Sequence, residues 1–505
     1  MSTPIVPIMD NLYLETFFFF VPDRLLWDNF QKFMGEQLNP GDSIDYLIPQ
    51  ASVGSGSGST DSVEVGSLED YFGIPTGINA VKFNALPLRA YYTIWNEFFR
   101  DQNLQDTITV NKGDTGIFDL LGEIPNGFKN PRLAGSCLPR GKRHDYFTSC
   151  LTSPQKFEAL RIPLTGNAPV FGNGKSVGFT DGSNNYGLID ETDDNGGSLN
   201  IWTGAYDKDV NVSGRSGTSP SNSKTVGLVT SGESGLYADL SEVTAATIND
   251  LRTAFQIQRL LESQNRSGTR YIEILAGQFG TWSGDARLQR PEYLGGSSAR
   301  ININPVMQTS ATTSSDYTPQ GNLAAYGVCA DRVNGFVKSF VEHGYIIGLV
   351  NVRADLNYQQ GMNRLWSRRT RYDFYWPTLA NLGEQAVLNR EIYCQGNKVK
   401  DAETNEIIDE KVFGYQERWA EYRYKPNMIT GKMRSTYAQS LDIWHLAQKF
   451  DELPVLSNEF IQDHPPIDRV IAVPSEPEFL LDVYFKEKWV RPMPVYSIPG
   501  LIDHF

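Results

Sequence analysis

The stretch that most restricts the possible folds of this chain is NLYLETFFFFVP, from Asn11 to Pro22. It begins with alternating apolar and polar residues and ends in an unbroken aromatic run, which is the pattern of a strand covered on both faces. Pro22 and Asp23 end this predicted strand. A chain of 505 residues is long enough to bury such a strand in a large core, as two domains or as one domain with long insertions.

Two segments that follow have the apolar spacing of helices. Residues 23–36 place Leu, Trp and Phe side chains at helical intervals, with Gly35 as a possible stop. Residues 86–104 carry Pro87 where a proline of the first helical turn is tolerated. The bulky residues of this second helix are predicted to share one buried stripe, made of Tyr91, Ile94, Trp95 and Phe98.

Residues 240–268 are the clearest helix of the chain. Thr247 and Asp250 offer a capping box, and Gly268 lies past the predicted end. The predicted apolar face consists of Ile248, Leu251, Phe255, Ile257 and Leu261.

Three later segments are predicted to be strands from their β-branched and aromatic content. They cover residues 270–279, 343–358 and 478–490. Many proline-punctuated strands with a few helices in their connections favour a mainly β fold, a sandwich or barrel carrying long loops. The last residues, RPMPVYSIPGLIDHF from Arg491, cannot form a regular helix, and we expect them to dock in extended form, either on their own barrel or on a neighbour.

A compositional shift spans about residues 165–236, which are rich in Gly, Ser, Asn, Thr and Asp. Such a stretch cannot bury enough apolar surface to form a strong core of its own, and it is too long for a simple loop. We expect an excursion stabilised by its neighbours; a disordered surface loop is the alternative. Residues 51–62, rich in Gly and Ser, are predicted to be a flexible loop rather than a phosphate-binding one.

No motif for catalysis or metal binding stands out. GNGKS, from Gly172, lacks the first glycine of a nucleotide-binding loop, because Pro169 stands there. The five histidines have no metal-binding spacing, and the four cysteines fit reduced buried thiols. We therefore predict no enzyme activity, no cofactor and no metal. Without an apolar run of bilayer length or a signal peptide, we expect no membrane insertion and assembly in a cytoplasm.

The charge balance restricts how the chain could contact nucleic acid. With 45 basic and 59 acidic residues, its net charge of -14 argues against packaging by bulk neutralisation. Any DNA contact must be a local patch, and three clusters combine basic with aromatic residues. The candidates are Arg140, Lys142 and Arg143; Arg364, Arg368, Arg369 and Arg371; and Arg418, Arg423 and Lys425.

These clusters have a second reading. Subunit interfaces favour Arg, Tyr and Trp as anchors, and Asp373, Glu417 and Glu421 are close enough in sequence to be salt-bridge partners. Contact with DNA, contact between subunits and pairing within the chain therefore all remain open.

Several long phrases resemble one known family. They are LPLRAYYTIWNEFFRDQNL from Leu86, LPRGKRHDYFTSCLTSPQK from Leu138, DARLQRPEYLGG from Asp285, EHGYIIGLVNVRADLNYQQG from Glu342 and VFGYQERWAEYRYKPNMITG from Val412. Together with FFFFVPDRLLWDNF, PQGNLAAYG and the C-terminal phrase, they stand in the order found in the major capsid proteins of the Microviridae, particularly the gokushovirus branch. Members of that family usually carry a further N-terminal segment, so here it is either absent or precedes the numbering.

The resemblance implies an eight-stranded antiparallel jelly roll with long loop insertions and a few helices. Residues 1–164 and 241–505 would form its core, with long inter-subunit loops, and residues 165–240 a variable insertion that forms a spike at the threefold axis. It also implies a virion protein that builds a T=1 icosahedral shell of sixty copies around circular single-stranded DNA. A small basic DNA-binding protein and a pilot protein would be its partners in the virion.

The resemblance further implies that the insertion meets a host cell-surface receptor. The candidate contact residues are Asn184, Tyr186, Asp193, Asp194, Trp202 and Tyr206. From composition alone, Asp193 and Asp194 are more simply read as a solvated turn. The rival hypothesis for the whole chain is a secreted carbohydrate-active β-sandwich enzyme or a glycan-binding module. An enzyme of that kind needs two facing carboxylates, a pair that the sequence does not show.

Overall fold

The computed structural model describes residues 1–52, 62–114, 137–157, 248–267, 271–280, 289–310, 320–332 and 335–491, and short strands between 170 and 238. The chain divides into two compact units. One combines Met1–Lys156 with Glu262–Phe505, and the other is Phe157–Leu261, which contains the segment predicted as an insertion.

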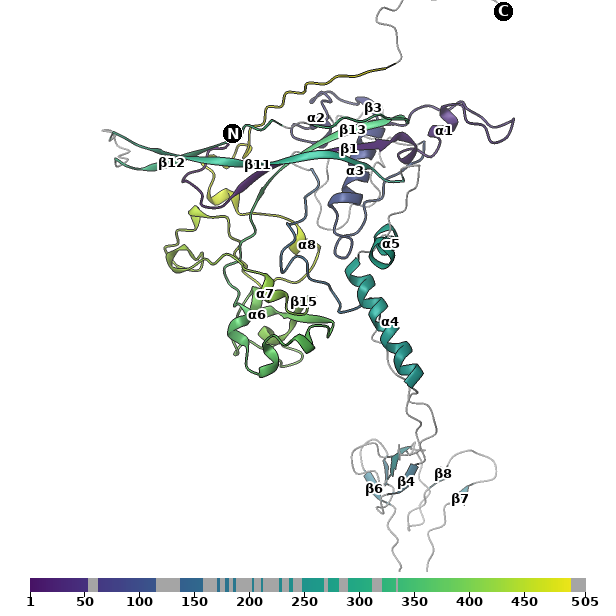
Figure 1. The fold of residues 1–505 in the computed structure, drawn as a ribbon, viewed down its shortest axis with the longest axis vertical. Coiled ribbons are helices and arrows are strands. Elements are labelled where there is room, and N and C mark those ends of the chain that lie inside the picture. The colour runs from purple at the N-terminus through teal and green to yellow at the C-terminus, as the bar shows by residue number, and fades with distance from the viewer. Residues whose placement is uncertain are drawn as a thin grey trace, which may run out of the picture. The chain divides into compact units, whose positions relative to one another are not determined.

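A four-stranded antiparallel sheet organises the first unit (Figure 1). Its order is β12-β11-β1-β13. The bounds are Leu12–Pro22 for β1, Glu292–Met307 for β11, Leu323–Val328 for β12 and Gly344–Ala354 for β13. Because β1 pairs along its length with both β11 and β13, the strand predicted from the aromatic run is an inner strand of the sheet.

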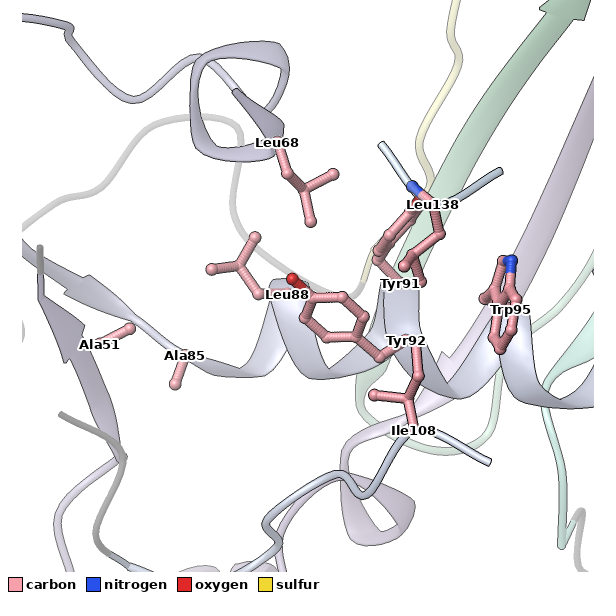
Figure 2. Packing of buried hydrophobic residues seen from close by; sticks show 9 residues of the cluster. All are labelled: Ala51, Leu68, Ala85, Leu88, Tyr91, Tyr92, Trp95, Ile108 and Leu138. Carbon is pink, nitrogen blue, oxygen red and sulfur yellow. The ribbon is translucent and has the colours of Figure 1, made fainter. Parts of the chain in front are cut away.

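Helix α3, Leu86–Ile94, packs against this sheet. It continues as a wider π-helical turn, η2, Trp95–Phe99. On one side Leu88, Tyr91 and Trp95 join the cluster shown in Figure 2. On another side Leu86, Ala90 and Ile94 pack against buried residues of β1 and β13. The predicted helix is confirmed but ends at Phe99. Its buried side chains lie on more than one side of α3 and do not form a single stripe.

The predicted helix over residues 23–36 is wrong as a continuous element. The structure has a single 3-10 turn, η1, Asp23–Leu25, and one short helix, α1, Phe30–Phe33. Between them the Asp28 N–H donates to the Lys112 carbonyl, and the Trp27 indole donates to Asp114 at 2.6 Å. These bonds to a distant loop replace the helical bonds, and the chain turns at Gly35, whose φ is +100°.

Asp23, the first residue of η1, is buried. Its Oδ1 has no hydrogen-bond partner among the residues that the structure describes. Burial raises the pKa of its carboxyl group to about 6, and the nearby His343 opposes the shift. Because the folded-state pKa lies above the unfolded value of 3.8, the folded state binds more protons between these values. The free energy of unfolding should therefore rise as the pH falls from about 7 to about 4.

We expect Asp23→Asn to raise the free energy of unfolding at pH 7 by about 2 kcal/mol, because it removes an ionised carboxylate whose burial raises its pKa. Urea denaturation at pH 7 and pH 4.5 measures this, and the gain should shrink at the lower pH. Asp28→Asn, at an exposed neighbouring position, is the control. Equal stability of D23N and the parent at pH 7 would contradict the prediction.

The remaining helices and strands only partly match the sequence predictions. Strand β13 confirms the prediction over residues 343–358, although it ends at Ala354. Helix α4, Ile248–Ser267, confirms the long helix, but Thr247 of the predicted capping box lies outside the described residues. Residues 270–279 were predicted as a strand and instead form helix α5, Tyr271–Phe279. Its Glu, Leu, Ala and Gln residues are good helix formers, and a short apolar run alone does not distinguish the two structures.

The predicted strand over residues 478–490 is also wrong. The chain there pairs with no strand of the described part of the molecule. Of the predicted loop 51–62, residues 53–61 lie outside the described residues. The four cysteines are free thiols, as predicted, but only Cys150 is buried, while Cys137 and Cys394 are exposed.

Short elements make up the rest of the first unit. Near α3 lie β2, Gln50–Ser52, paired with β3, Lys82–Asn84, and helix α2, Leu68–Tyr71. Strand β14, Glu384–Leu388, pairs with β15, Val412–Glu417, over a core that includes Phe147 and Phe413. The short helices around it are α6, Asn389–Ile392, α7, Ala420–Arg423, and α8, Asn458–Ile461. The connections contain 3-10 turns η3 Arg364–Ser367, η4 Arg371–Asp373, η5 Pro377–Leu379, η6 Ile408–Glu410, η7 Gly431–Met433, η8 Asp442–Trp444 and η9 Ile467–Arg469.

The second unit contains short antiparallel pairings. Strand β4, Val170–Gly172, pairs with β10, Leu236–Ala238, and β7, Trp202–Thr203, pairs with β8, Val210–Asn211. Strand β5, Gly178–Thr180, lies between β6, Asn185–Gly187, and β9, Gly227–Leu228.

The fold is antiparallel β with few helices, as predicted. Every pairing between the named strands is antiparallel. The largest sheet within the described ranges has four strands, so the eight-stranded jelly roll stays a proposal. No described helix is long and apolar enough to cross a membrane.

Candidate functional site

The residues of the first predicted basic cluster, Arg140, Lys142 and Arg143, contact carboxylates and aromatic rings of their own chain. Glu15, in the middle of β1, accepts hydrogen bonds from Arg140 and from Arg143, the latter at 2.8 Å. Arg353 of β13 lies 3.8 Å from the same carboxylate. Burial acts to raise the pKa of Glu15, but the hydrogen bonds and positive charges of these arginines outweigh it and lower the pKa.

The other contacts of this cluster also lie within the chain. The Arg140 guanidinium lies over the Phe17 ring, 4.8 Å from its centroid. Lys142 is buried, with its ammonium group 4.1 Å from the centre of the Phe460 ring, and burial lowers its pKa to about 8. Arg143 also reaches Asp355 at 3.4 Å. These groups therefore hold the 137–151 segment against the sheet, and little of their charge is left for an external ligand.

The second and third predicted clusters meet in space, although about fifty residues separate them in the sequence. The Arg418 guanidinium donates to the Tyr372 carbonyl at 3.4 Å, and the Tyr375 N–H donates to the Tyr422 hydroxyl at 3.2 Å. Arg368 lies over the Tyr422 ring at 4.4 Å from its centroid. We call the surface formed by residues 364–376 and 417–425 the aromatic–basic surface.

Some cations of this surface are bound to carboxylates. Arg364 donates to Glu391 at 3.1 Å, Arg368 lies 3.9 Å from Glu421, and Arg423 is paired with Glu417. The Arg423 pair is exposed on both sides, so it contributes little to stability.

Other cations have no carboxylate partner within 4 Å in the described part of the chain. They are Arg369, Arg371, Arg418 and Lys425, and all except Arg418 are exposed. The Arg371 guanidinium donates to the Tyr372 hydroxyl at 2.7 Å and lies beside its ring. Three exposed positive charges are thus available to an anion on this surface.

Large aromatic side chains are exposed beside these cations. They are Trp366, Tyr372, Phe374, Tyr375, Trp376 and Tyr422. Trp366 is 76% exposed, which is unusual for a tryptophan in a folded chain. Exposed rings next to unpaired cations suit either stacked bases with their phosphates or the aromatic anchors of a subunit interface.

Sequence reasoning missed two features of these sites. Glu15 and Arg353 were not singled out, although a carboxylate in the middle of a covered strand calls for a buried cation. The rings of Phe374, Tyr375 and Trp376 were also not named. Their position directly after the second basic cluster was the available signal.

The predicted receptor residues lie in the second unit. Tyr186 is in β6 and Trp202 is in β7. Asn184, Asp193, Asp194 and Tyr206 lie outside the described residues. Their role in attachment stays a prediction. Within the described ranges, no group of three or more His, Cys, Asp or Glu side chains could hold a metal ion.

Comparison with known proteins decides the family. The sequence model of the capsid protein (F protein) family matches residues 1–501. The chain belongs to this family. The capsid protein VP1 of Chlamydia phage 1 is 42% identical over 538 residues, which cover 99% of this chain and 88% of that protein. Capsid protein VP1 of Bdellovibrio phage phiMH2K is 43% identical, with 100% of this chain and 88% of that protein covered.

Capsid protein VP1 of Spiroplasma virus 4 is 38% identical, with 99% of this chain and 87% of that protein covered. The family membership confirms the resemblance to Microviridae capsid proteins of the gokushovirus branch. The chain is therefore a structural protein of the virion and not an enzyme. The rival carbohydrate-active enzyme is excluded.

Proposed function

We propose that this capsid protein assembles with copies of itself into a closed T=1 icosahedral shell around a circular single-stranded DNA genome. The observation that carries the proposal is the match of nearly the whole chain to capsid proteins. Each subunit would complete an eight-stranded jelly roll, for which the antiparallel sheet around β1 provides four strands. The insertion within residues 165–240 would project outward for host attachment.

The exposed surface of the subunit supports self-association. A closed shell needs heterologous contacts, in which different patches of neighbouring copies meet under rotation. The large exposed side chains of the aromatic–basic surface are the residue types that anchor protein interfaces. Monomeric soluble proteins rarely expose so many large aromatic side chains on one surface.

Expression of the chain followed by sedimentation and negative-stain microscopy tests the proposal. We expect uniform closed particles, or pentamers that mature into them when virion partners are added. A chain that stays monomeric under all these conditions would contradict it.

We also propose that the aromatic–basic surface contacts the genome. The net charge of -14 leaves most neutralisation to another molecule, a role that suits a small basic protein of the virion. The capsid protein would then order only a few nucleotides, with phosphates at Arg369, Arg371 and Lys425 and bases on the neighbouring rings.

Replacing both Arg369 and Arg371 by Gln should weaken binding of a single-stranded oligonucleotide. Because two phosphate contacts are lost, the slope of log K against log salt should become shallower by about 1.4. Fluorescence anisotropy over a salt series measures this, and Lys82→Gln, at an exposed cation of β3, is the control. Unchanged affinity and slope in the double variant would assign the surface to subunit contact instead.

A further inference from the structure

The C-terminal arm, which we define as Leu480 to Arg491, is exposed at every residue. Phe479, directly before it, still packs against the cluster of Leu12 and Ile301. The arm itself presents seven large apolar side chains, namely Leu480, Leu481, Val483, Tyr484, Phe485, Trp489 and Val490. Exposed apolar surface of this extent marks an interaction site.

The backbone of the arm is almost unpaired. The Leu480 N–H donates to the Met1 carbonyl at 3.0 Å, and the Met1 ammonium donates to the Leu480 carbonyl at 2.7 Å. From Leu481 to Arg491 no backbone group bonds to another backbone group of the described chain. An extended chain of this length reaches about 35 Å, so the arm can extend well past the sheet from which it leaves.

Strand β13 has the complementary feature, an open edge. It is the last strand in the order β12-β11-β1-β13 and pairs with β1 along its 11 residues. On its other side, no backbone group of Gly344–Ala354 has a backbone partner within the described ranges. Val350 of this strand is exposed. A long open edge of this kind readily pairs with another strand.

The arm leaves the sheet at the edge opposite to β13. Ser2 exchanges backbone hydrogen bonds with Gly327 of β12. Its neighbour Met1 exchanges backbone hydrogen bonds with Leu480. The N-terminal residues and strands β12, β11 and β1 therefore lie between the start of the arm and β13 of the same chain. With strands about 4.8 Å apart, that separation is roughly 20 Å or more across the sheet. A second copy can meet the arm directly at its own β13 edge.

We propose that the C-terminal arm adds as a strand to the open edge of β13 in a second copy of this chain. The arm from Leu481 to Arg491 is as long as β13, and both have free backbone donors and acceptors. Main-chain hydrogen bonds would supply affinity, and alternate side chains such as Leu481, Val483 and Phe485 would pack on one face. The contact is heterologous, arm to edge, and rests on the proposed function because a closed shell consists of such contacts.

Cross-linking of mixed particles tests this contact. Chains carrying V483C are co-assembled with chains carrying V350C, with the exposed native Cys137 and Cys394 replaced by Ser in both. A short bis-maleimide that joins positions 483 and 350 must then join two different chains. We expect this link in particles, together with slower amide exchange of residues 481–491 than in dissociated subunits.

Two results would overturn the proposal. One is a 483–350 link that forms only when both substitutions are in one chain. The other is arm amides that exchange as fast in particles as in free subunits. If the parent chain forms no particles or pentamers at all, the proposed function fails instead, so the two failures are distinguishable.

A variant series supplies a second readout. Replacing Leu481, Val483 and Phe485 by Ser should lower the yield of particles roughly tenfold or more, because the apolar face of the contact is lost. The thermal midpoint of the free subunit should not change, since these side chains are exposed there. The control replaces Asp482, Lys486 and Lys488 by Ser in the same arm. Full particle yield from the apolar variant would also overturn the proposal.

Discussion

Replacing Glu15 by Gln is expected to lower the free energy of unfolding of the subunit by about 3 kcal/mol or more. The carboxylate binds Arg140 and Arg143 and lies near Arg353, and its side chain is only 12% exposed. Gln preserves the shape but removes the negative charge, so the buried guanidinium of Arg353 and the partly buried ones of Arg140 and Arg143 lose the carboxylate between them. Urea denaturation at pH 7 measures the effect.

The effect of this substitution should depend on pH. The pKa of Glu15 is lowered in the folded state, so its stabilisation is complete above the unfolded value of 4.5. It is lost as the pH falls through the lower folded-state pKa, and the difference between the parent and E15Q should shrink there. Glu417→Gln, which breaks the exposed pair with Arg423, is the control and should cost at most about 1 kcal/mol. Equal costs for both substitutions would refute the central role of Glu15.

The second large effect is expected at Gly296 of β11. A Cβ atom at this position would overlap the carbonyl oxygen of Thr16 on the neighbouring β1. Backbone atoms of a paired strand cannot move aside cheaply, so Gly296→Ala should cost on the order of 3 kcal/mol. Thermal unfolding followed by circular dichroism measures this loss.

Gly41→Ala provides the matched control for Gly296. Gly41 is exposed, and an added Cβ would meet nothing within 4 Å. A substitution there should change stability by no more than about 0.5 kcal/mol. If G296A unfolded at the same temperature as G41A, the close pairing of β1 with β11 would be wrong.

Elements could be predicted from the sequence where the spacing of their apolar residues matches the residues that are buried in the structure. The aromatic run of β1 predicts two covered faces. In the structure Phe19 packs with residues of α3 on one face, and on the opposite face Phe18 and Phe20 contact Phe336 and Phe340. The prediction of a strand over residues 270–279 was wrong because a short apolar run fits a strand and a helix equally well. The prediction for residues 478–490 failed for a different reason: their composition is that of a strand, but no strand within the described residues pairs with them.

The sites were predictable only as local clusters. The sequence contains the basic and aromatic residues of the aromatic–basic surface, but not the contact that brings Tyr372 beside Arg418. It likewise cannot show that Arg140 and Arg143 are bound to Glu15, which lies more than a hundred residues earlier. Such long-range pairing decides which cations remain available to a ligand.

We propose that copies of this chain contact one another in a closed shell of fixed size. Mass photometry of purified empty particles measures the number of copies in the shell. We expect one species of about 3.4 MDa, sixty times the 56.6 kDa of the chain. A single species at the mass of one chain, or a continuous distribution of open aggregates, would contradict it.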